Sequence, residues 1–442
     1  MSFIHKDSCE CAKSELDLFT APMTQTAIEN GVWTEYNPVS AINDGTPIEF
    51  FVGGSGTDYI DLANTQLFVR AQLLRGDGTP IDNTNRVAPI NLFLHSLFSE
   101  VDVKLNDTLV SSSNNMYSFR SYIESLLSYG SDAKKSQLTA SLYYKDEGGA
   151  DGFEEGNPLD VNATNRGMVK RNSFFMNGNA VEMLGCIHSD LFFQEKYLPS
   201  DVGMRLRFVR NKDAFCLMSS LQNPQYKVKI VDCKLLVRKV HISPSVFVAQ
   251  AKAFEVGNAK YAIRRVICKS YTIATGARDN THENLFSGQL PSRLVIGLVR
   301  NAAFNGSYHM NPYHFRHYDV SSVKVLLDGQ SQHVKAIECN FADHHTICAY
   351  MSLFSGSNKW RRDEGNEIDR QDYERGYTLF CYDLSPDLSE ETHFNLSREG
   401  NVRVDLKFEV ALPHTVNVVI YAEFESIIQI DRNKNILIDY TN

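Results

Sequence analysis

The sequence has no long apolar run, and its first residues carry none of the marks of a secretory signal. The most apolar stretch, residues 416–430, contains Glu423 and Glu425 and falls short of the roughly 18 apolar residues that a membrane span needs. Residues 1–7 lack the positive region, the apolar core and the small-residue cleavage site of a signal peptide. We therefore expect no membrane span, and a chain that is made and folded in the cytosol.

Positive charge is also scarce. The 44 Lys and Arg residues are outnumbered by 53 Asp and Glu, which gives a formal net charge of -9. A protein with this net negative charge is not expected to bind the phosphates of a nucleic acid over its whole surface. Two short basic stretches, residues 264–265 and 359–362, are weak motifs that we interpret as solvated turns or strand edges. Weak, salt-sensitive DNA binding at best is expected.

Disulfide bonds are not expected either. The nine cysteines are an odd number, and in a reducing compartment cysteines act mostly as small buried hydrophobes. Cys9 and Cys11 lie near the start of the chain. The others lie in predicted strands: Cys186, Cys216, Cys233, Cys268, Cys339, Cys348 and Cys381.

Signatures of catalysis and cofactor binding are missing. The glycine-rich stretch 53–56 is followed neither by Gly-Lys-Ser/Thr nor by a helical pattern, so we interpret it as a loop between strands. There is no Gly-x-Ser-x-Gly nucleophile elbow, and no Cys/His pair has a recognisable catalytic context. The acidic pairs 154–155 and 390–391 are interpreted as solvated charge. The sequence therefore predicts no catalytic residue and no bound cofactor.

Histidines gather at His314 and His317 and again at Asp343-His344-His345. Imidazole and carboxylate groups of this kind bind metal ions in β-barrel enzymes, including cupins. However, adjacent histidines on one strand point to opposite faces, so His344 and His345 would not easily bind one ion. We predict hydrogen-bonding loop histidines and no metal site.

What the sequence does contain is the period-two alternation of β-strands. In residues 402–410 the odd positions are charged, and the even positions, which are apolar, share one face. The same alternation is found at Leu67, Val69, Ala71 and Leu73, and at Met204, Leu206 and Phe208. Within residues 226–240 the apolar phase slips, which predicts a β-bulge near Ile230. Residues 427–440 predict a final hairpin.

Helical patterns are few and lie between strands. Residues 116–127 carry apolar side chains at spacings of three and four, after Ser113 and Asn114 and before Gly130. A second helix is predicted over residues 246–256. Ser243 is its expected N-cap, Pro244 its first helical residue and Gly257 its terminator.

The chain repeats itself. The pattern of residues 101–107 followed by 121–130 returns as 323–329 followed by 349–356. In the same order, residues 190–193 are matched by 378–381, and 203–209 by 401–410. The sequence therefore predicts a duplicated β-rich domain. The spacing between matching segments places an insertion in the first copy, at about residues 145–180, which is acidic and glycine-rich and is expected to be an exposed, mobile loop.

These observations predict four segments. Residues 1–30 form an N-terminal arm, which is ordered only where it docks. Residues 31–243 form the first domain, residues 244–258 a helical linker, and residues 259–442 the second domain.

Several segments resemble the major capsid proteins of polintons (Mavericks) and the related adintoviruses. They are residues 93–103, 189–198, 212–216, 284–291, 303–307, 363–366 and 415–424. The resemblance extends from about residue 30 to the C-terminus. It implies an all-β fold of two tandem eight-stranded jelly rolls, a double jelly roll with short helices in its loops.

The resemblance also implies a function. The chain would be the major capsid protein of a double-stranded DNA virus or virus-like mobile element, made in the host cytoplasm and located in the virion. Homotrimers would form pseudo-hexameric capsomers of an icosahedral shell, together with neighbouring capsomers and a single jelly-roll penton protein. The arm would thread under neighbouring capsomers. The protein would not be an enzyme; a cupin-like metal-dependent enzyme and a carbohydrate-binding jelly-roll protein are the alternatives.

Overall fold

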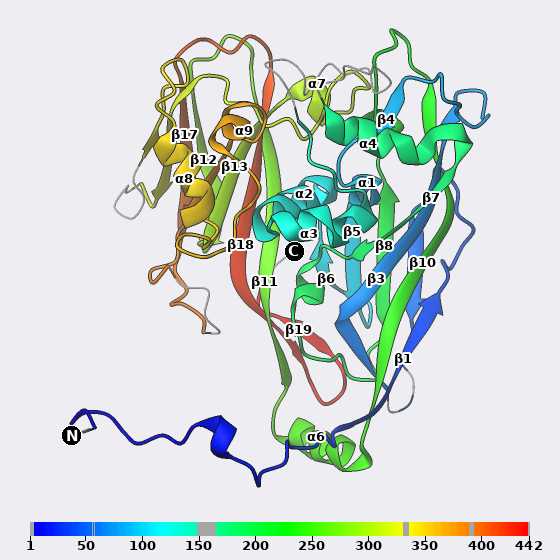
Figure 1. Cartoon of the computed structure of the whole chain (residues 1–442), viewed down its shortest axis with the longest axis vertical. Helices are drawn as coiled ribbons and strands as arrows, with labels where there is room; N and C mark the ends of the chain where they lie inside the picture. Colours follow the sequence, from blue (N-terminus) through cyan, green and yellow to red (C-terminus); the bar gives the residue numbers. More distant parts are fainter. Residues whose placement is uncertain are drawn as a thin grey trace.

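Two β-sandwiches stand side by side in the computed structural model, with helices between them and one helix at the foot of the molecule (Figure 1). The structure describes residues 4–54, 56, 58–147, 165–329, 336–388 and 393–440. Each sandwich consists of two antiparallel sheets of four strands, and a fifth short strand joins one sheet of the second sandwich. One continuous hydrophobic core runs through both sandwiches.

The strands of the first sandwich come from residues 28–242. One sheet has the order β1 (Ile28–Tyr36), β10 (Tyr226–Ile242), β3 (Asp58–Arg75) and β7 (Ala180–Cys186). The facing sheet has the order β2 (Ile48–Val52), β8 (Met204–Arg210), β5 (Phe98–Leu105) and β6 (Thr108–Ser112). Two short strands, β4 (Val87–Pro89) and β9 (Leu217–Ser219), pair separately.

The second sandwich repeats this arrangement. One sheet has the order β11 (Ala259–Ile273), β18 (Val416–Ile430), β13 (Arg293–Arg300) and β16 (Leu379–Asp383), and β19 (Ile436–Ile438) pairs with β18. The facing sheet has the order β12 (Asp279–Gln289), β17 (Glu399–Phe408), β14 (Val320–Leu327) and β15 (Ile337–Glu338). The pairing of β18 with β19 confirms the predicted final hairpin.

The two copies have the same strand order. If the eight sheet strands of each copy are counted along the chain, the first pairs with the eighth, the eighth with the third and the third with the sixth. In the facing sheet the order is second, seventh, fourth and fifth. This is the connectivity of a jelly roll. The fold is therefore two tandem eight-stranded jelly rolls, as predicted.

Most of the internal repeats match equivalent elements. Residues 101–107 and 323–329 lie in and just after β5 and β14, the fourth strand of each roll. The pairing of residues 190–193 with 378–381 is wrong, because Asp190–Phe193 is a 3-10 helix whereas β16 corresponds to β7. An apolar string is needed in both places, since Leu191 and Phe192 are buried without forming a strand.

The predicted alternation is confirmed in the strands. Leu67, Val69 and Ala71 are fully buried, as are Val402, Val404 and Leu406, whereas Val410 lies beyond the end of β17 and is exposed. The strand register shifts between Ile230 and Asp232, which confirms the predicted bulge.

The helices lie in the connections between strands. They are α1 (Phe93–Ser96), α2 (Tyr117–Ser128), α3 (Ser131–Lys135), α4 (Arg166–Phe175), α5 (Asp213–Cys216), α6 (Pro244–Val256), α7 (Asn301–Phe304), α8 (Ile347–Ser355) and α9 (Arg370–Glu374). Both predicted helices, α2 and α6, are confirmed. Ser243 is in the N-cap position of α6, but its hydroxyl bonds that of Ser245 instead of a backbone N–H.

The insertion of the first copy is only partly the exposed loop that the sequence predicts. Residues 148–164, with Glu154 and Glu155, lie outside the described residues. The segments on either side are packed against the core: Arg171 on α4 is fully buried and bonds Asp146 at 2.6 Å. Its Nε also donates to the backbone oxygen of Pro89. Arg171 follows Lys170 near the end of an acidic insertion, and no sequence pattern indicated that it is buried.

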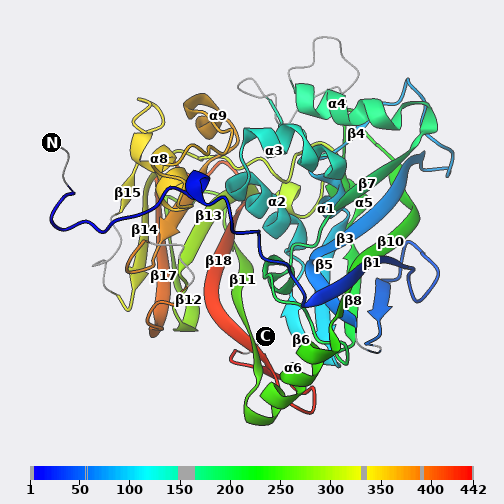
Figure 2. The ribbon, with the colours of Figure 1, turned by 60° about the horizontal axis from the view of Figure 1, so that its bottom comes forward.

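Residues 4–27 are exposed throughout and run along the underside of the molecule, below the second roll in Figure 1 and in front of it in Figure 2. Their one regular element is a 3-10 turn at Ser14–Leu16. Strand β1 begins at Ile28 and pairs with β10, so the arm leaves the molecule beside the end of β10.

Candidate functional site

The histidines that stand out in the sequence lie in loops, where His314 is buried and His345 is exposed. His317 stacks on Phe341 with ring centroids 4.1 Å apart. His344 has a positive φ of 57° and its Nδ1 lies 2.7 Å from a Glu374 oxygen. His344 and His345 thus lie in a turn, and not on a strand that would point their side chains to opposite faces. Within the described ranges, no three His, Cys, Asp or Glu side chains gather in a way that could hold a metal ion.

The two basic stretches are not simply solvated, as the sequence suggested. Lys359 is buried, and its ammonium donates to the backbone oxygen of Ser128 at 3.0 Å. Arg265 is buried between the rings of Phe424 and Tyr440, at 4.8 and 4.6 Å. Their neighbours Arg264, Arg361 and Arg362 are exposed. Basic side chains in these two stretches therefore serve internal contacts as well as the surface.

The glycine-rich stretch joins β2 to β3, as predicted. A Cβ atom on Gly54 would lie 2.0 Å from the backbone oxygen of Ser200. The glycine there allows two backbone segments to approach closely. The acidic pair Glu390 and Glu391 lies outside the described residues.

All nine cysteines are described, and none forms a disulfide. Cys216, Cys233, Cys268, Cys339 and Cys381 are buried, as expected of small hydrophobes. The strand assignment is wrong for Cys216 and Cys348, which lie on α5 and α8, and for Cys339, which follows the end of β15.

The contact between the two rolls is built around helix α2. Tyr122 of this helix stacks on Tyr313 of the second roll, with ring centroids 4.0 Å apart and planes at 1°. Phe119 stacks in the same way on Phe304, at 5.1 Å. The hydroxyl of Tyr313 donates to the backbone oxygen of Ser118. An aromatic layer therefore joins the first roll to the second.

Buried charges cross the same contact. Arg120 on α2 bonds Glu124 at 2.8 Å and Asp190 at 2.7 Å, and all three side chains are almost fully buried. Asp190 also accepts a hydrogen bond from the backbone N–H of Val266, on the first strand of the second roll. Because a buried charge without a partner is very unfavourable, this network fixes how the two rolls meet.

His188 extends the network. Its Nδ1 lies 2.6 Å from Glu124, and its Nε2 lies 3.8 Å from the sulfur of Cys186. Burial opposes the charge on His188, but Cys186 and Glu124 outweigh it and raise its pKa to about 9. The neighbouring His95 has no such partner: burial, and then the charge of His188, hold its pKa well below the usual range.

A second group of contacts joins the rolls near the ends of the insertion. The ammonium of Lys134 donates to the backbone oxygens of Leu126 and Asn366, and burial lowers its pKa to about 7. Lys145 pairs with Asp372 at 2.5 Å. These contacts, with the aromatic layer and the buried charges, make one rigid unit of the two rolls.

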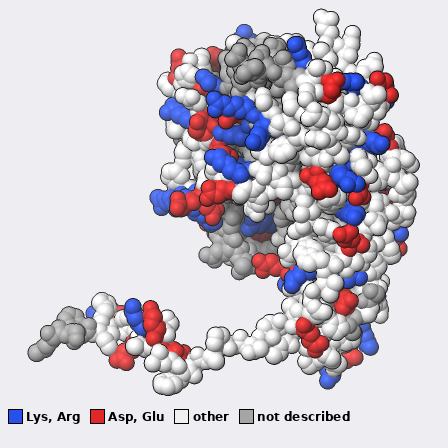
Figure 3. Space-filling model, turned by 45° about the vertical axis from the view of Figure 1, so that its right-hand side comes forward, with Lys and Arg blue, Asp and Glu red and all other residues white. Residues whose placement is uncertain are grey.

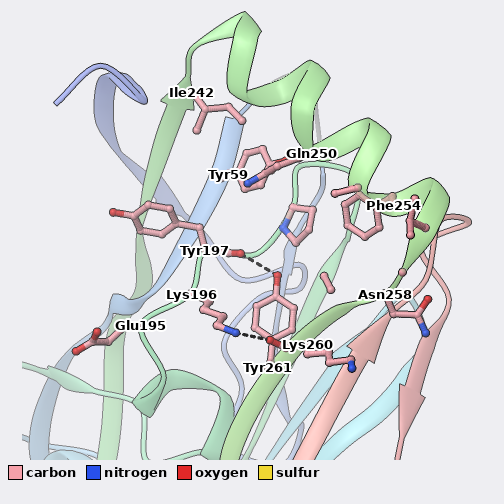
Figure 4. Close-up of a pocket in the computed structure, with 15 residues that line it drawn as sticks. Tyr59, Glu195, Lys196, Tyr197, Ile242, Gln250, Phe254, Asn258, Lys260 and Tyr261 are labelled. Atoms are coloured by element: carbon pink, nitrogen blue, oxygen red, sulfur yellow. Dashed lines mark hydrogen bonds between the residues drawn. The ribbon is translucent and has the colours of Figure 1, made fainter. Parts of the chain in front are cut away.

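A hollow of about 730 Å³ opens at the foot of the molecule, between helix α6 and the rolls, so that it lies beneath the helix as drawn in Figure 4. The side chains that line it are mainly apolar or aromatic, and include Tyr59, Tyr197, Ile242, Phe254 and Tyr261. Hydrogen bonds fix its wall: Tyr261 donates to the backbone oxygen of Tyr197 at 2.9 Å. Unlike the contact between the rolls, this hollow is open.

No sequence pattern indicated this hollow, and only a weak pattern indicated the buried charges. Arg120 and Glu124 are four residues apart within the apolar pattern of residues 116–127. Such a pair on the buried face of a helix could have marked a salt bridge across a contact. Asp190, His188 and Val266 carry no comparable sequence signal.

The strand order of the two rolls defines a double jelly roll. Solved structures share this fold across nearly the whole chain. A structure of the Sputnik virophage covers 99% of this chain and 94% of its own at a TM-score of 0.65 and 11% identity. The match to the PBCV-1 virus capsid covers 96% of this chain and 100% of that chain, with a TM-score of 0.54 and 11% identity. The match to the mavirus major capsid protein covers 100% of this chain and 97% of that chain, with a TM-score of 0.52 and 10% identity.

Two further findings concern sequence. An uncharacterised protein of Caenorhabditis elegans is 27% identical over 430 residues, which are 95% of this chain and 99% of that protein. No family model matches the chain. Of the helices that the structure describes, none has the length and apolar character needed to cross a membrane.

Proposed function

We propose that this chain is the major capsid protein of a double-stranded DNA virus or virus-like mobile element, and that three copies form one capsomer. The observation that carries the proposal is the rigid side-by-side pairing of two rolls with the same strand order. Three such chains around a threefold axis present six similar walls. A pseudo-hexamer of this kind fills one hexagonal cell of an icosahedral shell.

The lineage that we propose is that of polintons and adintoviruses. The capsid-like segments of the sequence support it, as does the full-length relative in an animal, Caenorhabditis elegans. A relative of this kind fits an element carried in an animal genome. The chain would be made in the host cytoplasm and located in the virion.

The partners that we propose are neighbouring capsomers and a single jelly-roll penton protein. The role is structural and not enzymatic. Electron microscopy of the expressed protein, alone and with its penton partner, tests the proposal. Hexagonal sheets or closed particles are expected, and a protein that stays dispersed under every assembly condition would contradict it.

Direct genome binding is not part of the proposed role. Lys and Arg side chains are interspersed with Asp and Glu on the face shown in Figure 3, and the net charge is -9. Separate basic proteins or counterions would then neutralise the genome. A titration of the purified protein with duplex DNA at physiological salt should show only weak, salt-sensitive binding; a nanomolar complex would overturn this statement.

A further inference from the structure

Helix α6 is unusual because it is apolar and yet remains largely exposed. Val246 and Phe247, in its first turn, pack against the small buried cluster of Tyr59, Val240 and Ile242. Eight of its thirteen residues are Val, Phe or Ala, and none is buried. Val248 is 52% exposed and Val256 is 93% exposed. An isolated helix of this length is marginal in water, and helices are stabilised mainly by packing of their apolar face. Beyond its first turn, the helix therefore offers exposed apolar surface next to the hollow.

The N-terminal arm has the complementary property. Leu16, Leu18, Phe19 and Met23 are each at least 74% exposed. They fall within residues 14–23, which also carry Glu15 and Asp17. A buried aromatic side chain removes about 150–250 Å² of surface from water. Docking of these side chains in an apolar hollow would therefore remove much apolar surface from water.

Charge also matches between the arm and the hollow. Lys196 and Lys260 line the hollow, with Glu195 as the opposing charge. The ammonium of Lys434 lies 4.0 Å from the ring centre of Phe254, at the same place. The cations therefore exceed the anions among these residues, which suits the two carboxylates of residues 14–23.

The root of the arm points it away from its own hollow. The backbone oxygen of Ala27 accepts from the N–H of Ser243, directly before α6. Gln25 then bonds both the N–H and the oxygen of Ile28 through its side-chain amide. The chain leaves this fixed point, passes beneath the second roll and ends beyond its edge (Figures 1 and 2). An arm that starts next to one hollow and leads outward is placed to reach the hollow of a neighbour.

We propose that residues 14–23 of one copy dock into the hollow beneath α6 of a second copy of this chain, with Phe19 as the main apolar anchor. The docking links copies at the foot of the molecule and covers α6. This inference rests on the proposed capsid function, since it supplies the contact between copies that a shell needs.

Disulfide trapping tests the docking. Phe19→Cys and Ala253→Cys, the second on the α6 wall of the hollow, are combined in a chain in which the exposed Cys9, Cys11 and Cys348 are replaced by serine. After mild oxidation under assembly conditions, a non-reducing gel should show covalent dimers and larger species. The yield should be roughly tenfold above that of the control, because docking raises the effective concentration of the two thiols.

The matched control keeps Ala253 and the native exposed Cys348 together with Phe19→Cys, and should give few covalent species. A band that stays at monomer size with no free engineered thiols would show that the arm fills its own hollow, which contradicts the inference. Free engineered thiols in assembled protein would also contradict it. Light scattering on the same samples reports trimers separately, so a failure of the docking is distinguishable from a failure of the capsomer proposal.

Discussion

Helices α2 and α6 both lie where the two rolls meet, but their surroundings are opposite. Every residue of α2 from Tyr117 to Leu127 is buried, and its charged side chains are paired. No residue of α6 is buried, and it borders an open hollow. The difference teaches that the contact between the rolls is completed by folding of one chain, whereas the foot is left for a partner to complete.

The largest effect on folding is expected when the central cation of the α2 contact is removed. Arg120→Met leaves Asp190 buried without its positive partner, and leaves Glu124 with His188 alone. We expect the free energy of unfolding to fall by about 3–5 kcal/mol. Chemical denaturation of the isolated protein measures this loss.

A matched control is Arg70→Met, which removes a half-buried arginine that lies 3.9 Å from the exposed Glu182. Exposed pairs of this kind contribute about 0–1 kcal/mol. Equal losses in the two variants would mean that the buried charges do not hold the rolls together.

Acid should weaken the same contact through His95. Its folded-state pKa lies well below that of an unfolded histidine, so the unfolded chain binds more protons below about pH 6.5. Stability is therefore lost as the pH falls below that value, by up to about 1.4 kcal/mol per pH unit. The raised pKa of His188 has the opposite effect: the stability that it contributes is lost as the pH rises through about 9.

His95→Gln removes the titrating group and keeps a polar partner for the Tyr117 hydroxyl, which lies 3.0 Å from His95 Nδ1. Unfolding measured between pH 5 and 6.5 should depend less on pH in this variant than in the parent chain. Parallel curves would assign the acid sensitivity to another group.

The smallest effect on folding is expected at α6. Val256→Ser changes a side chain that is 93% exposed and lines the hollow, so the free energy of unfolding should stay within about 0.5 kcal/mol of the parent value. Association between copies should nevertheless weaken, because the apolar surface offered to the arm is smaller. Sedimentation of the assembled protein measures this association.

Val410→Ser serves as its control, since Val410 is 48% exposed and lies outside the hollow. If both variants assemble equally well, the α6 surface is not used between copies. If Val256→Ser instead unfolds the chain, Val256 stabilises its own fold, which contradicts the role of α6 as a surface for a second copy.

Much of the fold follows from local sequence patterns. Alternation located the strands that contain Leu67 and Val402, and the spacing of apolar residues located α2. The repeated strings revealed the duplication because equivalent strands of two similar rolls need similar buried side chains. The same rule misplaced residues 190–193, where an apolar string fills the core without forming a strand.

The contacts that matter for assembly were harder to predict. Arg120, Asp190 and Val266 meet across the contact between the rolls although they are far apart in the sequence. No local pattern encodes such a meeting. The exposure of α6 was equally hidden, because its apolar residues look the same whether the surface that covers them belongs to this chain or to another.

The mass of the protein in solution shows whether three copies associate. Light scattering on the purified 49.9 kDa chain should give about 150 kDa, the mass of a closed trimer with six similar walls. A protein that remains strictly monomeric at high concentration would contradict the account.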